Sequence, residues 1–223
     1  MLVHGSSWAD WYDLFANVFD GTDNGSERWW WINRACAQFL GYGSADFERG
    51  TVCTDQRVIV LGCGELSGDE GHIYNVPLPP AHSAQTVLRR LTITLSWLTP
   101  INPRHRSYRV AHLWVDPPSI HLKVKRRDAD HDAVARGTVR HEVLEGDAAV
   151  PITAGDTTPV QVNCWADAAT NLTLPVPYAL MVSLETAQPL AVSIYDQVKV
   201  ALLDALRAPV PVRPAAARVR PQK

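Results

Sequence analysis

The sequence contains no hydrophobic run close to the roughly 20 residues that a membrane-spanning helix needs. Its first ten residues lack both the basic stretch and the apolar stretch of a secretory signal. Charge is nearly balanced, with 21 Lys and Arg against 23 Asp and Glu, so the net charge is −2. A protein with this balance has no general attraction for nucleic acid or for a membrane surface, and we expect neither as a partner.

Cysteine is scarce, and its spacing excludes the usual zinc and redox motifs. The four cysteines are Cys36, Cys53, Cys63 and Cys164, and no two of them form a Cys-x-x-Cys pair. Two disulfides are arithmetically possible. Because no secretory signal is present, we interpret the cysteines instead as reduced, buried thiols of a cytoplasmic protein.

Nucleotide-binding motifs are absent. The chain has neither a Gly-x-x-x-x-Gly-Lys-Ser/Thr loop nor a Gly-x-Gly-x-x-Gly segment. Gly41-Tyr-Gly43 is only a fragment of the second motif, and it follows a predicted helix rather than a strand. We therefore expect no nucleotide and no other cofactor.

Metal-binding and serine-nucleophile motifs are also incomplete. His141-Glu142 begins like a zinc-helix motif, but Glu145 stands where the second histidine belongs, and the surrounding sequence is strand-like. The Gly-x-Ser-x-Gly turn of many serine hydrolases is missing. Ser6 and Ser7 lie too close to His4 in sequence to suggest a triad, and a mobile chain end could not hold one. We assign no catalytic, cofactor-binding or metal-ligating residue.

Hydrophobic residues make up 46% of the 223 residues, which is the composition of a folded globular protein. The length allows one full-sized core and a smaller appendage. Apolar side chains recur at helical spacing over residues 11–19 and 27–40, and Gly41 then stands where a C-terminal cap belongs. Within the second helix, Trp29-Trp30-Trp31 point about 100° apart, so at least one must meet a different surface, which is another domain, a lost partner or a ligand.

After about residue 51, the spacing changes to that of β-strands. The clearest strand is 91–97, where Leu91, Ile93, Leu95 and Trp97 share the core face and Thr92, Thr94 and Ser96 share the other. The other expected strands are residues 57–61, 71–78, 109–115, 120–124, 138–144, 160–165 and 178–184. Short strands separated by proline and glycine turns favour an antiparallel sandwich over a parallel sheet.

The C-terminal part combines a helix with a basic tail. A last helix is predicted over residues 193–207, with Ser193 at its start and Asp196 three residues later in a capping-box-like pattern. Residues 208–223 hold four prolines, four basic residues and no acid, and we expect them to be disordered. Residues 104–127 are also basic, which is typical of a nucleic-acid surface or of an edge strand protected by charge. The second interpretation fits a slightly acidic chain better.

Several segments resemble the subtilisin-like serine proteases, or subtilases. Residues 2–9 (Leu-Val-His-Gly-Ser-Ser-Trp-Ala) look like the segment that follows the nucleophile helix in that family. Residues 39–46 resemble the Gly-Tyr-Gly-x-(Val/Ala)-(Asn/Asp) segment that closes its catalytic domain. Longer segments resemble the C-terminal β-rich domain of one bacterial subset, and they lie at residues 72–80, 89–97, 100–105, 136–143 and 160–164. The resemblance covers nearly the whole chain up to about residue 207.

The resemblance does not extend to the catalytic residues. The family's nucleophile lies in a Gly-Thr-Ser-x-Ala segment, whereas Gly21-Thr22-Asp23 and Gly50-Thr51-Val52 of this chain lack the serine. In the family that segment lies upstream of the point that matches Leu2, and the catalytic Asp and His lie further upstream. The resemblance thus implies that the chain begins just after an active site and has no protease activity of its own.

We therefore predict a mainly β protein built around an antiparallel, jelly-roll-like sandwich. The expected divisions are residues 1–50 as the helical end of a subtilase-like α/β catalytic domain, 51–187 as an accessory sandwich, 188–207 as a C-terminal helix and 208–223 as a tail. The implied function is that of the non-catalytic part of a serine endopeptidase, which stabilises the catalytic core or positions substrates or partners.

The resemblance also implies partners. These are the missing catalytic core, in cis or as a separate chain, and an ATPase, because similar proteases are often encoded beside one. Without that core, the apolar faces of the first two helices, with Trp8, Trp11 and the Trp29–Trp31 cluster, are expected to be exposed. The alternative is a stand-alone β-sandwich binding or adaptor module without protease activity.

Overall fold

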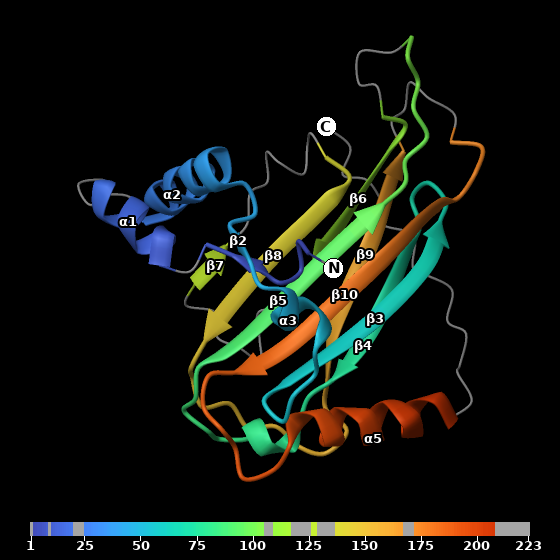
Figure 1. Ribbon diagram of the computed structural model, residues 1–223. Coiled ribbons are helices and arrows are strands. Elements are labelled where there is room, and N and C mark those ends of the chain that lie inside the picture. Colours follow the sequence, from blue (N-terminus) through green and yellow to red (C-terminus); the bar gives the residue numbers. More distant parts are fainter. Residues whose placement is uncertain are drawn as a thin grey trace.

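The computed structural model describes residues 2–8, 10–19, 25–104, 109–116, 126–128, 137–166 and 172–207. It confirms the predicted fold class: the chain is mainly β, with two antiparallel sheets packed face to face and a helix after the last strand (Figure 1). The helices are α1 (Asp10–Val18), α2 (Gly25–Leu40), α3 (Phe47–Thr51) and α5 (Ile194–Arg207), with a 3-10 turn at Pro80–His82. The strands are β1 (Ser6–Ser7), β2 (Ser44–Ala45), β3 (Arg57–Leu66), β4 (Gly71–Pro77), β5 (Arg89–Trp97), β6 (Ala111–Asp116), β7 (Arg126–Asp128), β8 (Val139–Gly146), β9 (Thr157–Ala166) and β10 (Val176–Thr186).

The strand order is that of a jelly roll. One sheet has the order β3-β10-β5-β8-β7 and the other has the order β4-β9-β6. The first strand of the sandwich pairs with the last, the second with the seventh and the third with the sixth, all antiparallel. This nesting is what results when one long hairpin rolls up and its strands divide between two sheets.

The core between the sheets follows the alternation of β5. Leu91, Ile93, Leu95 and Trp97 are all buried and belong to the same apolar cluster as residues of the facing sheet, such as Val162. The predicted register is therefore correct. Among the described strands, β6 lies at the edge of its sheet. The expected strand at 120–124, most of the basic stretch 104–127 and the tail 208–223 lie outside the described residues.

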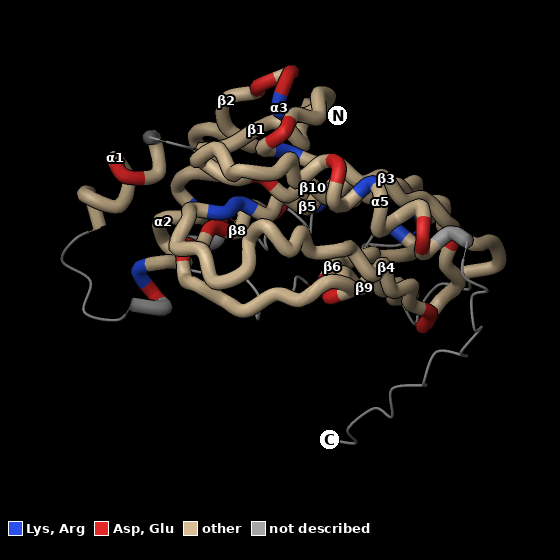
Figure 2. Tube along the Cα trace, turned by 90° about the horizontal axis from the view of Figure 1, so that it is seen from below, with Lys and Arg blue, Asp and Glu red and all other residues tan. Residues whose placement is uncertain are grey.

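The N-terminal segment lies on the outer face of the five-stranded sheet (Figures 1 and 2). There β1 pairs with β2, with Ser6 opposite Ala45 and Ser7 opposite Ser44. Figure 2 shows the resulting order of layers: β1, β2 and α3 on top, then the five-stranded sheet, then β6, β9 and β4. The outer face of the larger sheet is consequently covered by protein over β5, which explains why Thr92 and Thr94 are buried although they point away from the core.

Helices α1 and α2 form a hairpin beside this segment, with a small core of their own. Trp8, Ile32 and Cys36 are buried at its centre. Gly41 ends α2 as predicted: its φ of 60° is left-handed, and its N–H donates to Ala37 O at 3.1 Å. At the other end of the chain, Ser193 Oγ accepts from the backbone N–H of Asp196 at 3.3 Å, which confirms the predicted start of α5.

Three expectations about the burial of side chains are wrong. Trp8 is not exposed, because its ring fills the core of the α1–α2 hairpin and its Nε1 donates to Gly41 O at 2.9 Å. The chain start is not a mobile end, because His4, Ser6 and Ser7 are buried against the sheet. Two of the four cysteines are not buried: Cys53 is only half-buried, and Cys63 points outward from β3 at the sheet edge. All four cysteines are free thiols.

Candidate interface on the outer sheet face

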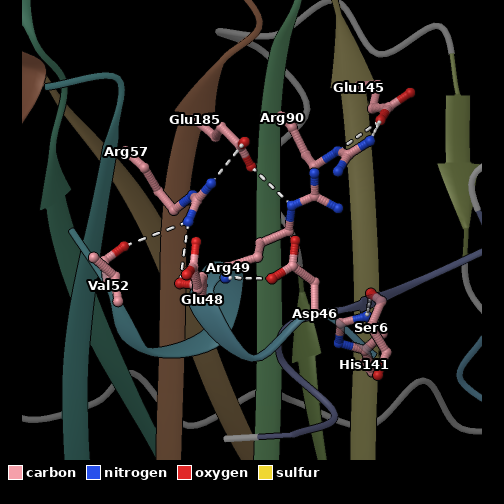
Figure 3. Close-up of polar contacts among 10 residues, drawn as sticks. All are labelled: Ser6, Asp46, Glu48, Arg49, Val52, Arg57, Arg90, His141, Glu145 and Glu185. Carbon is pink, nitrogen blue, oxygen red and sulfur yellow. Dashed lines mark hydrogen bonds and ion pairs between the residues drawn. The ribbon is translucent and has the colours of Figure 1, made fainter. Parts of the chain in front are cut away.

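A row of alternating charges crosses the outer face of the five-stranded sheet near one end. The strand register places Arg57, Glu185, Arg90 and Glu145 side by side on β3, β10, β5 and β8. Arg57 Nη2 lies 3.2 Å from Glu185 Oε1, and Arg90 Nη2 lies 2.6 Å from Glu145 Oε1 (Figure 3). These side chains are largely shielded from water, so their attraction is screened less than that of surface pairs.

Helix α3 is attached to this row through its own charges. Arg49 Nε of α3 lies 3.4 Å from Glu185 Oε2, so Glu185 joins α3 to β3 through two arginines. Arg57 also donates to the last carbonyls of the α3 region, at Glu48 O and Val52 O. Asp46 caps the start of α3 by accepting from Arg49 N at 3.0 Å, and this hydrogen bond lowers the pKa of the Asp46 carboxyl.

Two rows further along the sheet, a chain of hydrogen bonds holds residues 2–8. His141 Nε2 lies 3.0 Å from Ser6 O, and a carbonyl can only accept, so this nitrogen carries the proton of the neutral ring. His141 Nδ1 therefore accepts from the Thr94 hydroxyl at 2.8 Å. The Thr94 oxygen in turn accepts from His4 Nδ1–H at 2.9 Å. The chain thus runs from His4 through Thr94 to His141 and ends at the backbone of β1.

These donor and acceptor roles apply when both histidines are neutral, and the burial of both rings favours that state. Burial, with a smaller contribution from the neighbouring His141 ring, lowers the pKa of His4 to about 3. Burial also lowers the pKa of His141 to about 4, against the opposing effects of the hydrogen bond to Ser6 and of the Glu142 carboxylate. His4 Nε2 is buried and has no hydrogen-bond partner among the described residues, so protonation there would create an unsatisfied buried cation.

Helix α1 has more apolar surface than the hairpin buries. Its inner side contributes Tyr12, Phe15 and Ala16 to the hairpin core. Trp11, Leu14 and Val18 fall within about 60° of one another on the helix, beside that inner side. They are 52%, 53% and 72% exposed. A helix that is apolar over about 200° of its circumference is typical of one that contacts two surfaces, and the described residues supply only one of them.

The tryptophan cluster of α2 divides between two environments, as its spacing requires. Trp29 is half-buried, whereas Trp30 and Trp31 lie on the exposed side with ring centroids 4.6 Å apart. The Arg34 guanidinium carbon lies 4.9 Å from the centroid of Trp30 and 5.9 Å from that of Trp31, so it covers part of both rings. The two outward rings are therefore partly occupied by their own helix.

The incomplete motifs singled out in the sequence do not come together as reactive sites. Ser6 Oγ donates to Leu2 O at 3.0 Å, and both nitrogens of His4 are accounted for above without a serine hydroxyl. His141 and Glu142 alternate along β8, so His141 points outward while Glu142 pairs with Arg140 on the other side. Among the described residues, no three His, Cys, Asp or Glu side chains lie close enough together to hold a metal ion.

The contacts with residues 2–8 and with α3 could not be found by motif search. Thr94 and His141 occupy ordinary outward positions of alternating strands. Their role becomes visible only when the segment that covers them, residues 2–8, is placed in the structure. The charge row was not predicted, because Arg90 and Glu145 lie one residue outside the expected strands at 91–97 and 138–144. Its partner Arg49 lies on α3, far from Glu185 in the sequence, and no local pattern pairs the two residues.

The chain matches no protein-family model, and no curated protein sequence matches it. None of the described helices is long and apolar enough to cross a membrane.

Proposed function

We propose that this chain is the C-terminal, non-catalytic part of a subtilisin-like serine endopeptidase, and that its sandwich fixes the orientation of the catalytic domain. One observation supports this proposal above the others. The two short segments that resemble the end of a subtilase catalytic domain, residues 2–9 and 39–46, pair with each other as β1 and β2. They are about 30 residues apart in sequence, and a family resemblance at both would account for their pairing.

The attachment of these segments to the sandwich supports the orienting role. Residues 2–8 are held by the hydrogen bonds through Thr94 and His141, and the stretch after β2 is held by the pairs of Arg49 and Arg57 with Glu185. A domain linked through such a segment would be connected rigidly, because several buried contacts would have to break before it could swing. A flexible linker would instead be polar and exposed.

The exposed stripe of α1 supports the presence of a partner surface. Trp11, Leu14 and Val18 form an apolar strip that a catalytic core, in cis or as a separate chain, would cover. An ATPase remains a proposed further partner on the resemblance alone. The stand-alone binding module is the second candidate, and it would leave this stripe for a different protein.

The first test is the DNA upstream of the Met1 codon. An in-frame segment encoding Gly-Thr-Ser-x-Ala within some tens of codons is the expected result. A stop codon and a ribosome-binding site directly before Met1 would count against the proposal and favour the stand-alone module.

The second test is association with a separately produced subtilase core. The full chain should co-elute with the core in size-exclusion chromatography, and Leu14→Lys should weaken this association at least tenfold. Asn17→Lys is the matched control, because Asn17 is also exposed on α1 but lies on its polar side. Equal binding of the core by the two variants would overturn the proposed interface. So would an unmodified chain that stays monomeric and does not bind the core.

A further inference from the structure

A groove of about 680 Å³ lies between α5 and the end of the sandwich, away from the interface described above. Figure 1 shows α5 across the lower ends of β3 and β4. One wall of the groove is α5 itself, and the other is formed by Pro77, Leu78 and the turn at residues 154–157. Its volume is within the range of pockets that bind ligands or peptide side chains.

Helix α5 packs on the sandwich with one side and lines the groove with another. Ile194 and Val198 are fully buried, and Val198 belongs to a core cluster with Val58, Leu78 and Leu184. The side that lines the groove carries Val200, Ala201 and Ala205, and Val200 is 58% exposed. The groove is thus lined by small apolar side chains that the sandwich itself leaves uncovered.

The charged residues of the groove are all acidic. Asp156, Asp196 and Asp204 line it, and its described lining includes no Lys, Arg or His. Asp196 and Asp204 are eight residues apart on α5, which corresponds to about 12 Å along the helix axis. An apolar groove with carboxylates spread along it favours an elongated occupant that combines small apolar groups with several positive charges.

The sequence directly after α5 has this composition. Residues 208–223 read Ala-Pro-Val-Pro-Val-Arg-Pro-Ala-Ala-Ala-Arg-Val-Arg-Pro-Gln-Lys, with four basic residues, no acid, and otherwise mostly Pro, Ala and Val. They lie outside the described residues, but sixteen extended residues reach about 50 Å, which is more than enough to return along the groove. We propose that residues 208–223 of this chain bind the groove beside α5, with their arginines toward Asp156, Asp196 and Asp204.

The test uses trypsin on the full chain, because residues 208–223 contain one suitable bond; cleavage at Arg207–Ala208, directly before them, gives a product of different mass and is counted separately. Arg213 and Arg220 precede proline and resist trypsin, whereas the Arg218–Val219 bond is open to it. Release of residues 219–223 is followed by mass spectrometry and compared with a free peptide of residues 208–223. We expect release from the chain to be about five- to tenfold slower, which is the range for a contact made by a few ion pairs and small apolar groups.

Matched variants locate the protection. Val200→Lys places a positive charge in the groove and should raise the cleavage rate to that of the free peptide. Leu203→Lys places the same charge on the same helix at an exposed position outside the groove lining, and should leave the rate unchanged. The double variant Asp196→Asn, Asp204→Asn should also lose protection, and added salt should weaken it in the unmodified chain.

Three results would overturn the proposal. The first is cleavage of the unmodified chain at the rate of the free peptide. The second is equal protection in Val200→Lys and Leu203→Lys, which would place the contact elsewhere. The third is protection that disappears on dilution, which would indicate binding to a second copy rather than within one chain.

Discussion

Acidification should destabilise this protein strongly between about pH 7.5 and about pH 5, because its folded state buries neutral histidines. His4 and His141 have pKa values lowered to about 3 and about 4 in the folded state, against about 6.5 in an unfolded chain. His82, buried near the 3-10 turn, is also lowered to about 4. A base with a lowered folded pKa takes up its proton only on unfolding. Its stabilising contribution is therefore complete above about pH 6.5 and is lost as the pH falls toward the folded pKa.

The expected loss follows from proton linkage. At about pH 5 the three rings remain mostly neutral in the folded state and mostly protonated in the unfolded state, which costs about 2 kcal/mol each relative to pH 7.5. Together they should lower the free energy of unfolding by about 6 kcal/mol, a large part of the 5–15 kcal/mol typical of a domain. Ordinary carboxyl groups titrate mainly below this window and contribute little within it.

Urea unfolding followed by tryptophan fluorescence at the two pH values measures this loss. The variant His141→Gln keeps a donor toward Ser6 O but cannot titrate, so its pH-dependent loss should be smaller by about 2 kcal/mol than in the unmodified chain. His82→Gln serves as the matched variant outside the interface and should show a similar reduction. A total loss below about 1 kcal/mol, or an unchanged pH dependence in both variants, would refute the neutral-histidine assignment.

Three further predictions concern the core and the chemistry. Leu95→Ala should lower the free energy of unfolding by about 2–5 kcal/mol because Leu95 is completely buried, whereas the exposed Leu61→Ala should change it by less than about 0.5 kcal/mol in the same urea titration. Gly62→Ala should lower the free energy of unfolding by about 1–3 kcal/mol, since a Cβ there would lie 2.6 Å from the Tyr74 ring. An unchanged melting temperature would show that β3 or the Tyr74 ring moves aside without cost. The folded chain should not react with a fluorophosphonate probe, because Ser6, the serine of the described residues near His4, donates to a backbone carbonyl and not to the imidazole; stoichiometric labelling lost in a His4→Ala variant would reverse that conclusion.

The sandwich could be predicted from the sequence because its information is local. In β5 the apolar side chains alternate with Thr92 and Thr94, so both the strand and its core face follow from a period of two. Gly41 and Ser193 likewise mark helix ends by their own conformational and hydrogen-bonding properties. The sequence predicted a jelly-roll-like sandwich but not which strands pair. The pairing of β3 with β10 joins residues more than a hundred positions apart, and no local pattern encodes it.

The burial of the N-terminal segment could not be predicted in the same way. Trp8 and His4 lie in a short stretch without periodicity, and the absence of a regular element suggested a loose end. Their burial depends on a partner surface, the outer face of β5 and β8, whose polar side chains look like those of a solvated face. Alternation identifies two faces of a strand, but it does not tell whether the polar face meets water or protein.

The polar character of that outer face has a consequence for how the segment is held. An apolar face would bind residues 2–8 in many positions at similar energy, because hydrophobic contact is not directional. Here the contact passes through His4, Thr94 and His141, and each buried group must find its partner or lose about 1–3 kcal/mol. Sliding the segment by one residue would break several of these bonds at once, while the net gain from making them is modest. The buried hydrogen bonds therefore contribute little to affinity and much to position, which is what the proposed orienting role would require.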